Sequence, residues 1–304
     1  MNRPPLRTRI APTPSGFLHI GNLYSFVLTW LIARVNGGTV RLRIDDLDEV
    51  RTRQEYLENI FRVLDFIGLV PDEGPSGVED FLGHHSQKLR FHNYMALINQ
   101  LKDAGHLFAC SCSRSRIMAE NPEGIYPGTC RTRQIESATK EIAWRVALPP
   151  GCLIQFQDVI TKKTNKVVLT EEMGDFAVMR KDGLPAYQIA SLADDLLYGI
   201  NLVVRGNDLR TSTAAQLHLA RLLSLSTFAS MDWHHHSLLR NEQKQKISKS
   251  AGDLSVWNMM EKGMKKDDFL YRIAPWLGLP QRPYQSLDEM HLACLELGLF
   301  CIIR

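Results

Sequence analysis

The first part of the chain shows two rhythms of hydrophobic and polar positions. The segments 6–11 and 39–44 are short runs with β-branched side chains, which are typical of strands. The segment 20–35 is apolar nearly all round and stops at a glycine pair, and 52–69 carries apolar side chains at helical spacing. The order strand, helix, strand, helix predicts a parallel sheet with right-handed crossovers.

The texture of the sequence changes after a further helical pattern at 87–102. The segment 108–170 contains clustered cysteines, glycine, proline and short alternating runs such as 142–148, and it predicts a small inserted subdomain of mixed structure. The strand and helix patterns then resume. They predict strands at 176–179, 202–205 and 237–239 and helices at 187–197, 211–223 and around 269–277.

Together these patterns predict an α/β fold, a doubly wound parallel sheet with an inserted subdomain. We expect the first half of a nucleotide-binding catalytic domain, the insertion, the second half of that domain and a short helical C-terminal segment. The expected boundaries are 1–107, 108–170, 171–250 and 251–304.

Composition narrows the class of protein. Of the 304 residues, 44% are hydrophobic and 23% charged, which are globular proportions that exclude wholesale disorder and collagen-like repeats. No apolar run is long enough to span a bilayer, the N-terminus lacks the apolar core of a secretory signal, and six cysteines do not make a disulfide scaffold. We therefore expect a soluble cytoplasmic protein without a membrane partner, whose net charge of +3 permits a nucleic-acid partner.

The loop between the first predicted strand and the first predicted helix is the first candidate site. It reads Pro12-Thr-Pro-Ser-Gly-Phe-Leu-His19-Ile-Gly21-Asn22. In a doubly wound sheet, ligands bind outside the strand ends, and a helix N-terminus suits an anion. Gly21 lets a ligand approach the backbone, and His19 can donate a hydrogen bond to a phosphate. The alternative is a proline-rich turn whose histidine only caps the helix.

A lysine-rich loop far along the chain is the second candidate site. It reads Lys244-Gln-Lys246-Ile-Ser-Lys249-Ser250. Two lysines three residues apart can neutralise the charge that develops on a triphosphate during attack at its α-phosphorus. The alternative is an ordinary solvated surface run.

Three clustered cysteines, Cys110, Cys112 and Cys130, are a candidate zinc site because thiolates are good zinc ligands. A closed tetrahedral site needs a fourth ligand, and the nearby residues His106, Tyr126 and Cys152 are options. The alternative is a group of packed thiols without a metal.

A run of three histidines at 234–236 is a weaker metal signal. Consecutive residues of an extended chain point in different directions, so the three rings do not converge on one ion. The run therefore predicts a strand edge or a loop.

The two loops together resemble the two signatures of the class I aminoacyl-tRNA synthetases. His19-Ile-Gly-Asn22 corresponds to the HIGH motif, and Lys246-Ile-Ser-Lys-Ser250 to the KMSKS motif. Further stretches are similar to the glutamyl branch and keep its order: Arg9-Ile-Ala-Pro-Thr-Pro-Ser-Gly16, Leu42-Arg-Ile-Asp-Asp46-Leu-Asp48, Asp182-Gly-Leu-Pro-Ala-Tyr187, Asp194-Asp195 and Val204-Arg205-Gly206. Two residues depart from the pattern. Asn22 replaces the last residue of the HIGH motif, and Asp45 stands where the family usually has Glu, one methylene short.

The resemblance implies a ligase that activates L-glutamate with ATP, accompanied by Mg²⁺, to glutamyl-adenylate and pyrophosphate. The glutamyl group then passes to a hydroxyl of an RNA. The implied catalytic residues are His19, Lys246 and Lys249, and those implied to hold ATP are His19, Gly21, Asn22 and Lys249. The residues implied to bind glutamate are Arg9, Ile10, Ala11, Pro12, Thr13, Asp45, Tyr187 and Arg205.

The cysteine cluster resembles one subfamily in particular, the glutamyl-queuosine tRNA(Asp) synthetases. The likeness lies in Cys110-x-Cys112 followed by Tyr126-Pro-Gly-Thr-Cys130, and it implies one Zn²⁺ per chain with Tyr126 as the fourth ligand. About fifty residues follow Ser250, too few for the helical anticodon-binding region of an ordinary glutamyl-tRNA synthetase, so we expect no such domain.

The resemblance implies queuosine-containing tRNA(Asp) as the acceptor and a monomeric enzyme. One alternative is a minimal or truncated glutamyl-tRNA synthetase that charges the 3′ end of tRNA(Glu). Another is a catalytically idle module that binds RNA or a nucleotide. The presence of His19 and of both motif lysines argues against the idle module.

Overall fold

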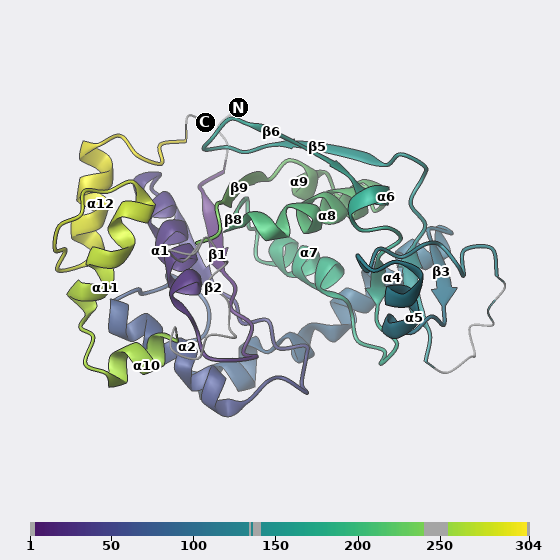
Figure 1. Ribbon diagram of the computed structural model, residues 1–304, viewed down its shortest axis with the longest axis horizontal. Coiled ribbons are helices and arrows are strands. Elements are labelled where there is room, and N and C mark those ends of the chain that lie inside the picture. The colour runs from purple at the N-terminus through teal and green to yellow at the C-terminus, as the bar shows by residue number, and fades with distance from the viewer. Residues whose placement is uncertain (1–3, 134, 136–140, 240–254, 303–304) are drawn as a thin grey trace.

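Parallel strands form the centre of the molecule (Figure 1). The computed structural model describes residues 4–133, 135, 141–239 and 255–302. β1 (Arg7–Ile10) pairs in parallel with β2 (Thr39–Leu42), and β8 (Leu202–Gly206) pairs in parallel with β9 (Asp232–His236). β1 and β8 are in contact, and the amide of Asn201 donates to the carbonyl of Arg7 at 3.0 Å. The strands therefore lie in the order β2-β1-β8-β9, which confirms the predicted parallel pairing.

Helix α1 (Ile20–Val35) connects β1 to β2 and is buried along most of its length, as its continuous apolar sequence predicts. The chain leaves the helix through Gly37, whose φ is +62°. At Gly38, a Cβ would lie 2.5 Å from Cδ2 and 2.8 Å from O of Leu6. Only glycine therefore allows β2 to begin this close to the start of β1.

The main body contains further helices, some of which pack on other helices. They are α2 (Gln54–Ile67), α3 (Val78–Asp80), α4 (Phe91–Asp103), α7 (Tyr187–Leu197), α8 (Arg210–Leu222), α9 (Ser226–Ala229), α10 (Val256–Glu261), α11 (Lys266–Ile273) and α12 (Leu287–Glu296). Short π- or 3₁₀-helical turns lie at Phe81–His85, Gln87–Arg90, Asn207–Leu209 and Ala274–Leu277. α12 packs on α1, and α10 and α11 pack on α2 (Figure 1). Among the described residues, no helix combines the length and apolar composition needed to cross a membrane.

The part of the chain expected to be an insertion of mixed structure contains antiparallel strands together with two short helices. A three-stranded sheet has the order β3-β4-β7, and β5 pairs with β6 as a hairpin. The elements are β3 (Leu107–Cys110), α5 (Arg114–Glu120), β4 (Ala143–Val146), β5 (Leu153–Gln157), β6 (Thr164–Val168), α6 (Leu169–Glu172) and β7 (Ala177–Met179). The cysteine cluster lies at the end of this sheet, where β3 stops.

Two strand predictions need correction. The strand expected at 176–179 exists as β7, but it pairs antiparallel with β4 and belongs to the sheet of the insertion. The segment 237–239 is not a strand, because β9 ends at His236. The strand is instead the largely polar run Asp232–His236, which pairs with β8. Its polar sequence has little strand preference of its own, so the pairing with β8 determines its structure. The expected domain boundaries otherwise stay a prediction.

The carboxylate of Asp158 ties the β5–β6 hairpin to β9. It accepts from the amide of His235 at 2.8 Å and lies 3.0 Å from Nδ1 of His234. The amides of Ile160 and Thr161 also donate to it, at 3.1 and 2.8 Å. The carboxylate is buried, so these donors satisfy a charge that would otherwise be costly in the interior.

Replacing Asp158 with alanine should lower the free energy of unfolding by about 3 kcal/mol, because the buried imidazole of His234 and several amides would lose their hydrogen-bond acceptor. Burial opposes ionisation of Asp158, but the hydrogen bonds from His234 and the amides outweigh it and lower the pKa of the carboxyl group. A lowered pKa in the folded state contributes stability above the unfolded value of about 4 and loses it as the pH falls further. Urea unfolding should therefore show a smaller difference in the free energy of unfolding between the wild type and Asp158→Ala at pH 3 than at pH 7. The exposed Asp103→Ala serves as the control, and an equal loss at both pH values would contradict the assignment.

Candidate active site and cysteine cluster

A cavity of about 300 Å³ opens at the carboxyl ends of β1 and β8, beside the N-terminus of α1. The predicted site residues that line it are Arg9, Ile10, Ala11, Pro12, Thr13, His19, Gly21, Asn22, Tyr187 and Arg205. Residues from opposite parts of the sequence thus meet where a doubly wound sheet presents its ligand site. Lys246 and Lys249 lie outside the described residues.

The N-terminus of α1 is capped by the motif itself. His19 is the residue before the helix, and its Nδ1 accepts from the amide of Gly21 at 3.1 Å. The amide of His19 in turn donates to Oδ1 of Asn22 at 3.0 Å. The capping role considered as an alternative is therefore present, and the same histidine also lines the cavity. Asn22 completes the cap, which gives its departure from the HIGH motif a structural reason.

The cavity also has walls that the sequence analysis did not assign. His236, the last residue of β9, lines the cavity, and so do Leu238 and Leu239, which follow the strand. Nε2 of His236 lies 3.0 Å from Oγ of Ser25, which belongs to α1. Their signal in the sequence was weak, because Leu238 and Leu239 were attributed to a strand.

The described residues on the two sides of the lysine-rich loop both lie at this cavity. Leu239 is part of its wall. Ser255 forms a β-bridge with His19, and the amide of Val256 donates to the carbonyl of Leu18 at 2.8 Å. The segment that contains the second motif therefore leaves and re-enters the described structure next to the first motif.

Arg9 enters the cavity from a buried cluster of matched charges. Its Nε donates to Oδ1 of Asp195 at 2.9 Å, and Nη1 of Arg43 donates to the same oxygen at 2.7 Å. Arg43 also donates to both oxygens of Asp45, at 2.7 and 3.0 Å. Burial alone would lower the pKa of Arg43, but the surrounding carboxylates raise it well above its usual value.

Asp45 is therefore not placed as expected. It was expected to bind glutamate, but its carboxylate is occupied by Arg43, and it is not among the residues that line the cavity. Residues 43 and 45 follow directly on β2 at alternate positions. In an extended chain such positions share a face, so the pairing had a signal in the sequence.

A second aspartate of the cluster, Asp194, is also fully partnered. It accepts from Nε of Arg90 at 2.9 Å, from the hydroxyl of Tyr94 at 2.8 Å and from Nε2 of Gln87 at 2.9 Å. Burial opposes its ionisation, but the hydrogen bond from Arg90 and the charge of Arg43 lower the pKa of Asp194. The Asp194-Asp195 motif thus anchors α7 under the cavity.

Arg205 lies at the opposite wall and has a different environment. Its guanidinium donates to the hydroxyl of Tyr187 at 3.2 Å, to Oγ1 of Thr213 at 2.5 Å and to Oε1 of Gln216 at 2.8 Å. Its Nε is buried without a partner. Among the described residues, no carboxylate lies within ion-pair distance of it, and burial lowers its pKa. A buried cation with only neutral acceptors is suited to an anionic ligand.

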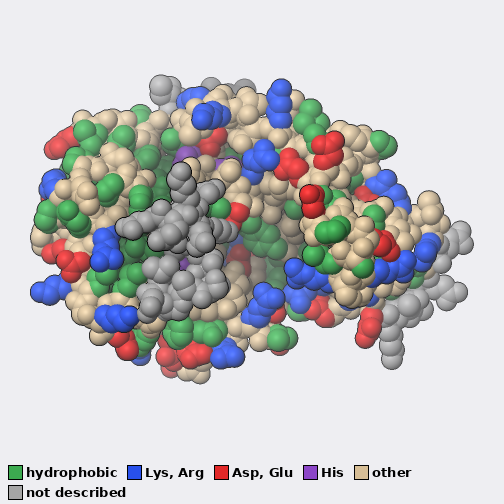
Figure 2. Space-filling view, viewed as in Figure 1, with side chains coloured by type: hydrophobic (Ala, Val, Ile, Leu, Met, Phe, Trp, Pro, Cys, Tyr) green, Lys and Arg blue, Asp and Glu red, His purple; other side chains and the backbone are tan. Residues whose placement is uncertain are grey.

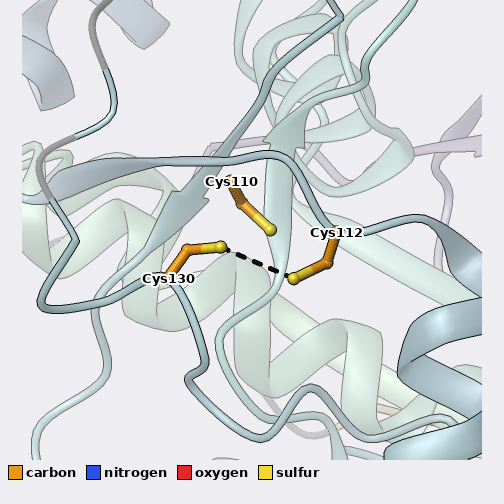
Figure 3. A group of neighbouring side chains, drawn as sticks. All are labelled: Cys110, Cys112 and Cys130. Carbon is orange, nitrogen blue, oxygen red and sulfur yellow. Dashed lines mark hydrogen bonds between the residues drawn. The ribbon is translucent and has the colours of Figure 1, made fainter.

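The predicted cysteine cluster comes together in the insertion (Figure 3). The sulfur atoms of Cys110, Cys112 and Cys130 lie within 4.8 Å of one another, and those of Cys112 and Cys130 are 3.5 Å apart. The hydroxyl of Tyr126 lies 3.5 Å from Sγ of Cys110 and accepts from the amide of Cys130 at 2.7 Å. His106 and Cys152 are not part of this group.

The cluster fits a tetrahedral zinc ion. Zinc–sulfur bonds of about 2.3 Å place tetrahedral thiolates about 3.8 Å apart, close to the observed spacing. Burial opposes ionisation, but hydrogen bonds from Tyr126 and the backbone of Ser111 lower the pKa of Cys130 to about 7. Burial raises the pKa of Cys112 to about 11. The three thiols are soft, buried donors, which is the kind of donor found in structural zinc sites.

Comparison with known proteins shows the family. Residues 5–274 match the model of the class I tRNA synthetases (E and Q), catalytic domain. The chain belongs to this family. The predicted resemblance and the predicted enzyme class, a ligase of the aminoacyl-tRNA synthetase type, are thereby confirmed.

Several relatives are similar over most of the chain. A glutamyl-Q tRNA(Asp) synthetase of Cupriavidus metallidurans is 38% identical over 81% of this chain and 77% of its own length. Another, of Burkholderia cenocepacia, is 34% identical over 96% of both chains. Glutamate–tRNA ligase 2 of Syntrophus aciditrophicus is 33% identical over 90% of this chain, which spans 58% of that protein. The crystal structure of the glutamate-tRNA synthetase from Elizabethkingia anophelis has a TM-score of 0.77 at 25% identity, covering 95% of this chain and 65% of its own.

Proposed function

We propose that the protein activates L-glutamate with ATP, giving enzyme-bound glutamyl-adenylate and pyrophosphate. The observation that carries this proposal is Arg205, a buried cation at the cavity wall whose described partners are all neutral. A ligand carboxylate at this position supplies the missing negative charge. The family and the names of the relatives support the same substrate.

The two ends of the cavity bind different substrates, ATP at one end and glutamate at the other. The N-terminus of α1, with His19, Gly21 and Asn22, holds the phosphates of ATP. The motif lysines Lys246 and Lys249, together with Mg²⁺, neutralise the leaving pyrophosphate. A glutamate α-carboxylate oxygen attacks the α-phosphorus in line, and the bond from that phosphorus to the pyrophosphate oxygen breaks. The enzyme's main contribution is positioning and charge neutralisation.

Glutamate lies between the two arginines at the sheet edge. Arg205 and Tyr187 bind its side-chain carboxylate, and Arg9 with the loop from Ile10 to Thr13 forms the other wall. Asp45 supports this wall indirectly, because it holds Arg43, and Arg43 shares Asp195 with Arg9. We therefore propose that Asp45 positions Arg9 through Arg43 and Asp195 and does not contact the substrate directly.

Exchange of labelled pyrophosphate into ATP tests this activity. With glutamate present and tRNA absent, we expect exchange that depends on glutamate, because the residues proposed to hold glutamate and the end of α1 proposed to hold the phosphates already line one cavity. Glutamine and aspartate are the control amino acids. Exchange that starts only when tRNA is added would favour the minimal glutamyl-tRNA synthetase, and no exchange under either condition would favour the idle module.

For the acceptor, we propose the queuosine base of tRNA(Asp). The support is the similarity to several proteins named glutamyl-Q tRNA(Asp) synthetase and the cysteine cluster with Tyr126. Queuosine carries a cyclopentenediol whose hydroxyl can attack the adenylate carbonyl, with AMP as the leaving group. The alternative, the 3′ end of tRNA(Glu), is supported by the similarity to a glutamate–tRNA ligase.

We also propose that Cys110, Cys112, Tyr126 and Cys130 hold one zinc ion with a structural role. Elemental analysis of protein purified without added metal should give about one zinc per chain, and Cys130→Ser should lose most of it. The exposed Cys301→Ser should retain the metal and is the matched control. Freshly prepared, active protein without zinc would contradict this assignment.

A further inference from the structure

Arg205 differs from the other buried arginines around the cavity in how its charge is balanced. Arg9, Arg43 and Arg90 form ion pairs with the aspartates at 45, 194 and 195. That cluster holds three positive and three negative side chains, so it is electrically matched. Arg205 has no such partner among the described residues, although it is 4% exposed.

The two acceptors on α8 that bind Arg205, Thr213 and Gln216, are fixed in place by hydrogen bonds of their own. Thr213 and Gln216 lie one helical turn apart on α8, and both are fully buried. Nε2 of Gln216 donates to the carbonyl of Gln188 at 3.4 Å, which turns its oxygen toward the guanidinium. The side chain is thus fixed as an acceptor for Arg205, and it carries no charge.

His235 fixes the second acceptor. It is the partner of Arg205 in the β8–β9 register, and its Nε2 lies 2.7 Å from Oγ1 of Thr213. The guanidinium can only donate, so Thr213 accepts from Arg205 and its hydroxyl proton is left for His235 or for the more distant carbonyl of Leu209, at 3.3 Å. Burial and the charge of Arg205 lower the pKa of His235 to about 3, so the ring is neutral at physiological pH.

We propose that Thr213, Gln216 and His235 form a neutral shell that determines the specificity of the site for glutamate over glutamine. They are positioning residues: Thr213 and Gln216 orient the guanidinium of Arg205, and His235 orients Thr213. Because none of them carries a negative charge, the charge of Arg205 stays available to the substrate. The proposal rests on the proposed function, in which Arg205 binds the side-chain carboxylate of glutamate.

The chemistry explains the choice between the two amino acids. Glutamate and glutamine have nearly the same shape, so the walls of the pocket cannot separate them well. Only glutamate brings the carboxylate that matches a buried cation, whereas the amide of glutamine leaves that charge unpaired. An acid in the shell would remove this difference, because it would pair with Arg205 before the substrate arrived.

The decisive variant is therefore Gln216→Glu, which adds a carboxylate at a position 2.8 Å from Arg205 with little change in size. In pyrophosphate exchange, kcat/KM for glutamate should fall on the order of a hundredfold, and the ratio of kcat/KM for glutamate to that for glutamine should fall at least about tenfold. Gln216→Leu is the matched control, since it removes the acceptor without adding charge. It should cost about tenfold with glutamate and keep the ratio.

His235 is tested independently, so the proposal does not depend on one variant folding. His235→Leu should raise KM for glutamate about tenfold and leave KM for ATP within about twofold. His235→Gln, which can place a polar atom near the position of Nε2, should restore most of the affinity. Combined with Thr213→Val, His235→Leu should add little, because both substitutions break the same chain of hydrogen bonds.

The outcomes separate this inference from the proposed function. A wild-type protein without glutamate-dependent exchange overturns both. If the wild type is active, an unchanged glutamate-to-glutamine ratio in Gln216→Glu overturns the neutral shell alone. So does a His235→Leu protein whose KM for ATP rises as much as its KM for glutamate, because a merely structural histidine would affect both substrates.

Discussion

Arg205→Ala is expected to reduce kcat/KM for glutamate by a factor on the order of a thousand, the equivalent of about 4 kcal/mol. The reason is that the described partners of this guanidinium are all neutral, so its charge is free for the substrate carboxylate. KM for ATP should stay within about twofold, because the phosphates are assigned to the N-terminus of α1. Steady-state pyrophosphate exchange with each substrate varied in turn measures both values.

Two control variants sharpen this result. Arg205→Lys keeps the charge but loses the planar fork. It should recover only part of the activity, because Nη1 of Arg205 donates to Tyr187 and Nη2 donates to both Thr213 and Gln216. Arg282→Ala, at an exposed surface ion pair, should behave like the wild type. An Arg205→Ala protein that loses ATP and glutamate affinity equally, or one that keeps full activity, would remove Arg205 from the glutamate site.

The sequence predicted best those elements whose signals are local. The helices at 20–35 and 187–197 have the predicted bounds, because apolar spacing and the residues that stop a helix act within a few positions. The strand β9 was misplaced because Asp232–His236 is polar. Its polar side chains are satisfied by groups far away in the sequence, such as Asp158 for His234. The histidine run at 234–236 was predicted to be a strand edge or a loop, and the structure places it in β9, but its pairing with β8 has no local signal.

The candidate site shows the same division. The part of the cavity lining that belongs to the motifs was predicted, whereas His236, Leu238 and Leu239 were not. The three cysteines and Tyr126 meet as expected. The pairing of Arg43 with Asp45 was missed, although their alternate spacing was a usable signal. The sequence could not have revealed the group formed by Thr213, Gln216 and His235. Nothing in the sequence of α8 or of β9 alone shows that these side chains face Arg205. Only the packing of α8 against the sheet brings these groups together.

Transfer of glutamate should require queuosine in the tRNA. We expect labelled glutamate to enter bulk tRNA from cells that make queuosine and to be absent from otherwise identical tRNA of cells that cannot make it. The physical reason is that the proposed nucleophile, a hydroxyl of the cyclopentenediol, exists only on the modified base. A tRNA whose 3′-terminal ribose has been oxidised should remain an acceptor. Because the oxidant also attacks the diol of queuosine, that diol has to be protected during the oxidation. Unmodified tRNA(Glu) is the matched control.

The salt dependence of this transfer tests how the RNA is held. Exposed cations available for phosphates include Arg133 and, in the β5–β6 hairpin, Lys162, Lys163 and Lys166. Figure 2 shows further Lys and Arg side chains gathered at the end of the molecule that holds β3 and α5. Arg131 of the same part of the chain forms an ion pair with Asp175 at 2.5 Å. Transfer should therefore weaken by about tenfold or more between 50 and 200 mM salt. Replacing Lys162 and Lys163 with glutamate should weaken transfer at all salt concentrations without changing activation.

For the acceptor itself, equal labelling of the tRNA pools with and without queuosine would contradict the assignment. It would favour a glutamyl-tRNA synthetase that charges the 3′ end, because only that reaction is indifferent to queuosine.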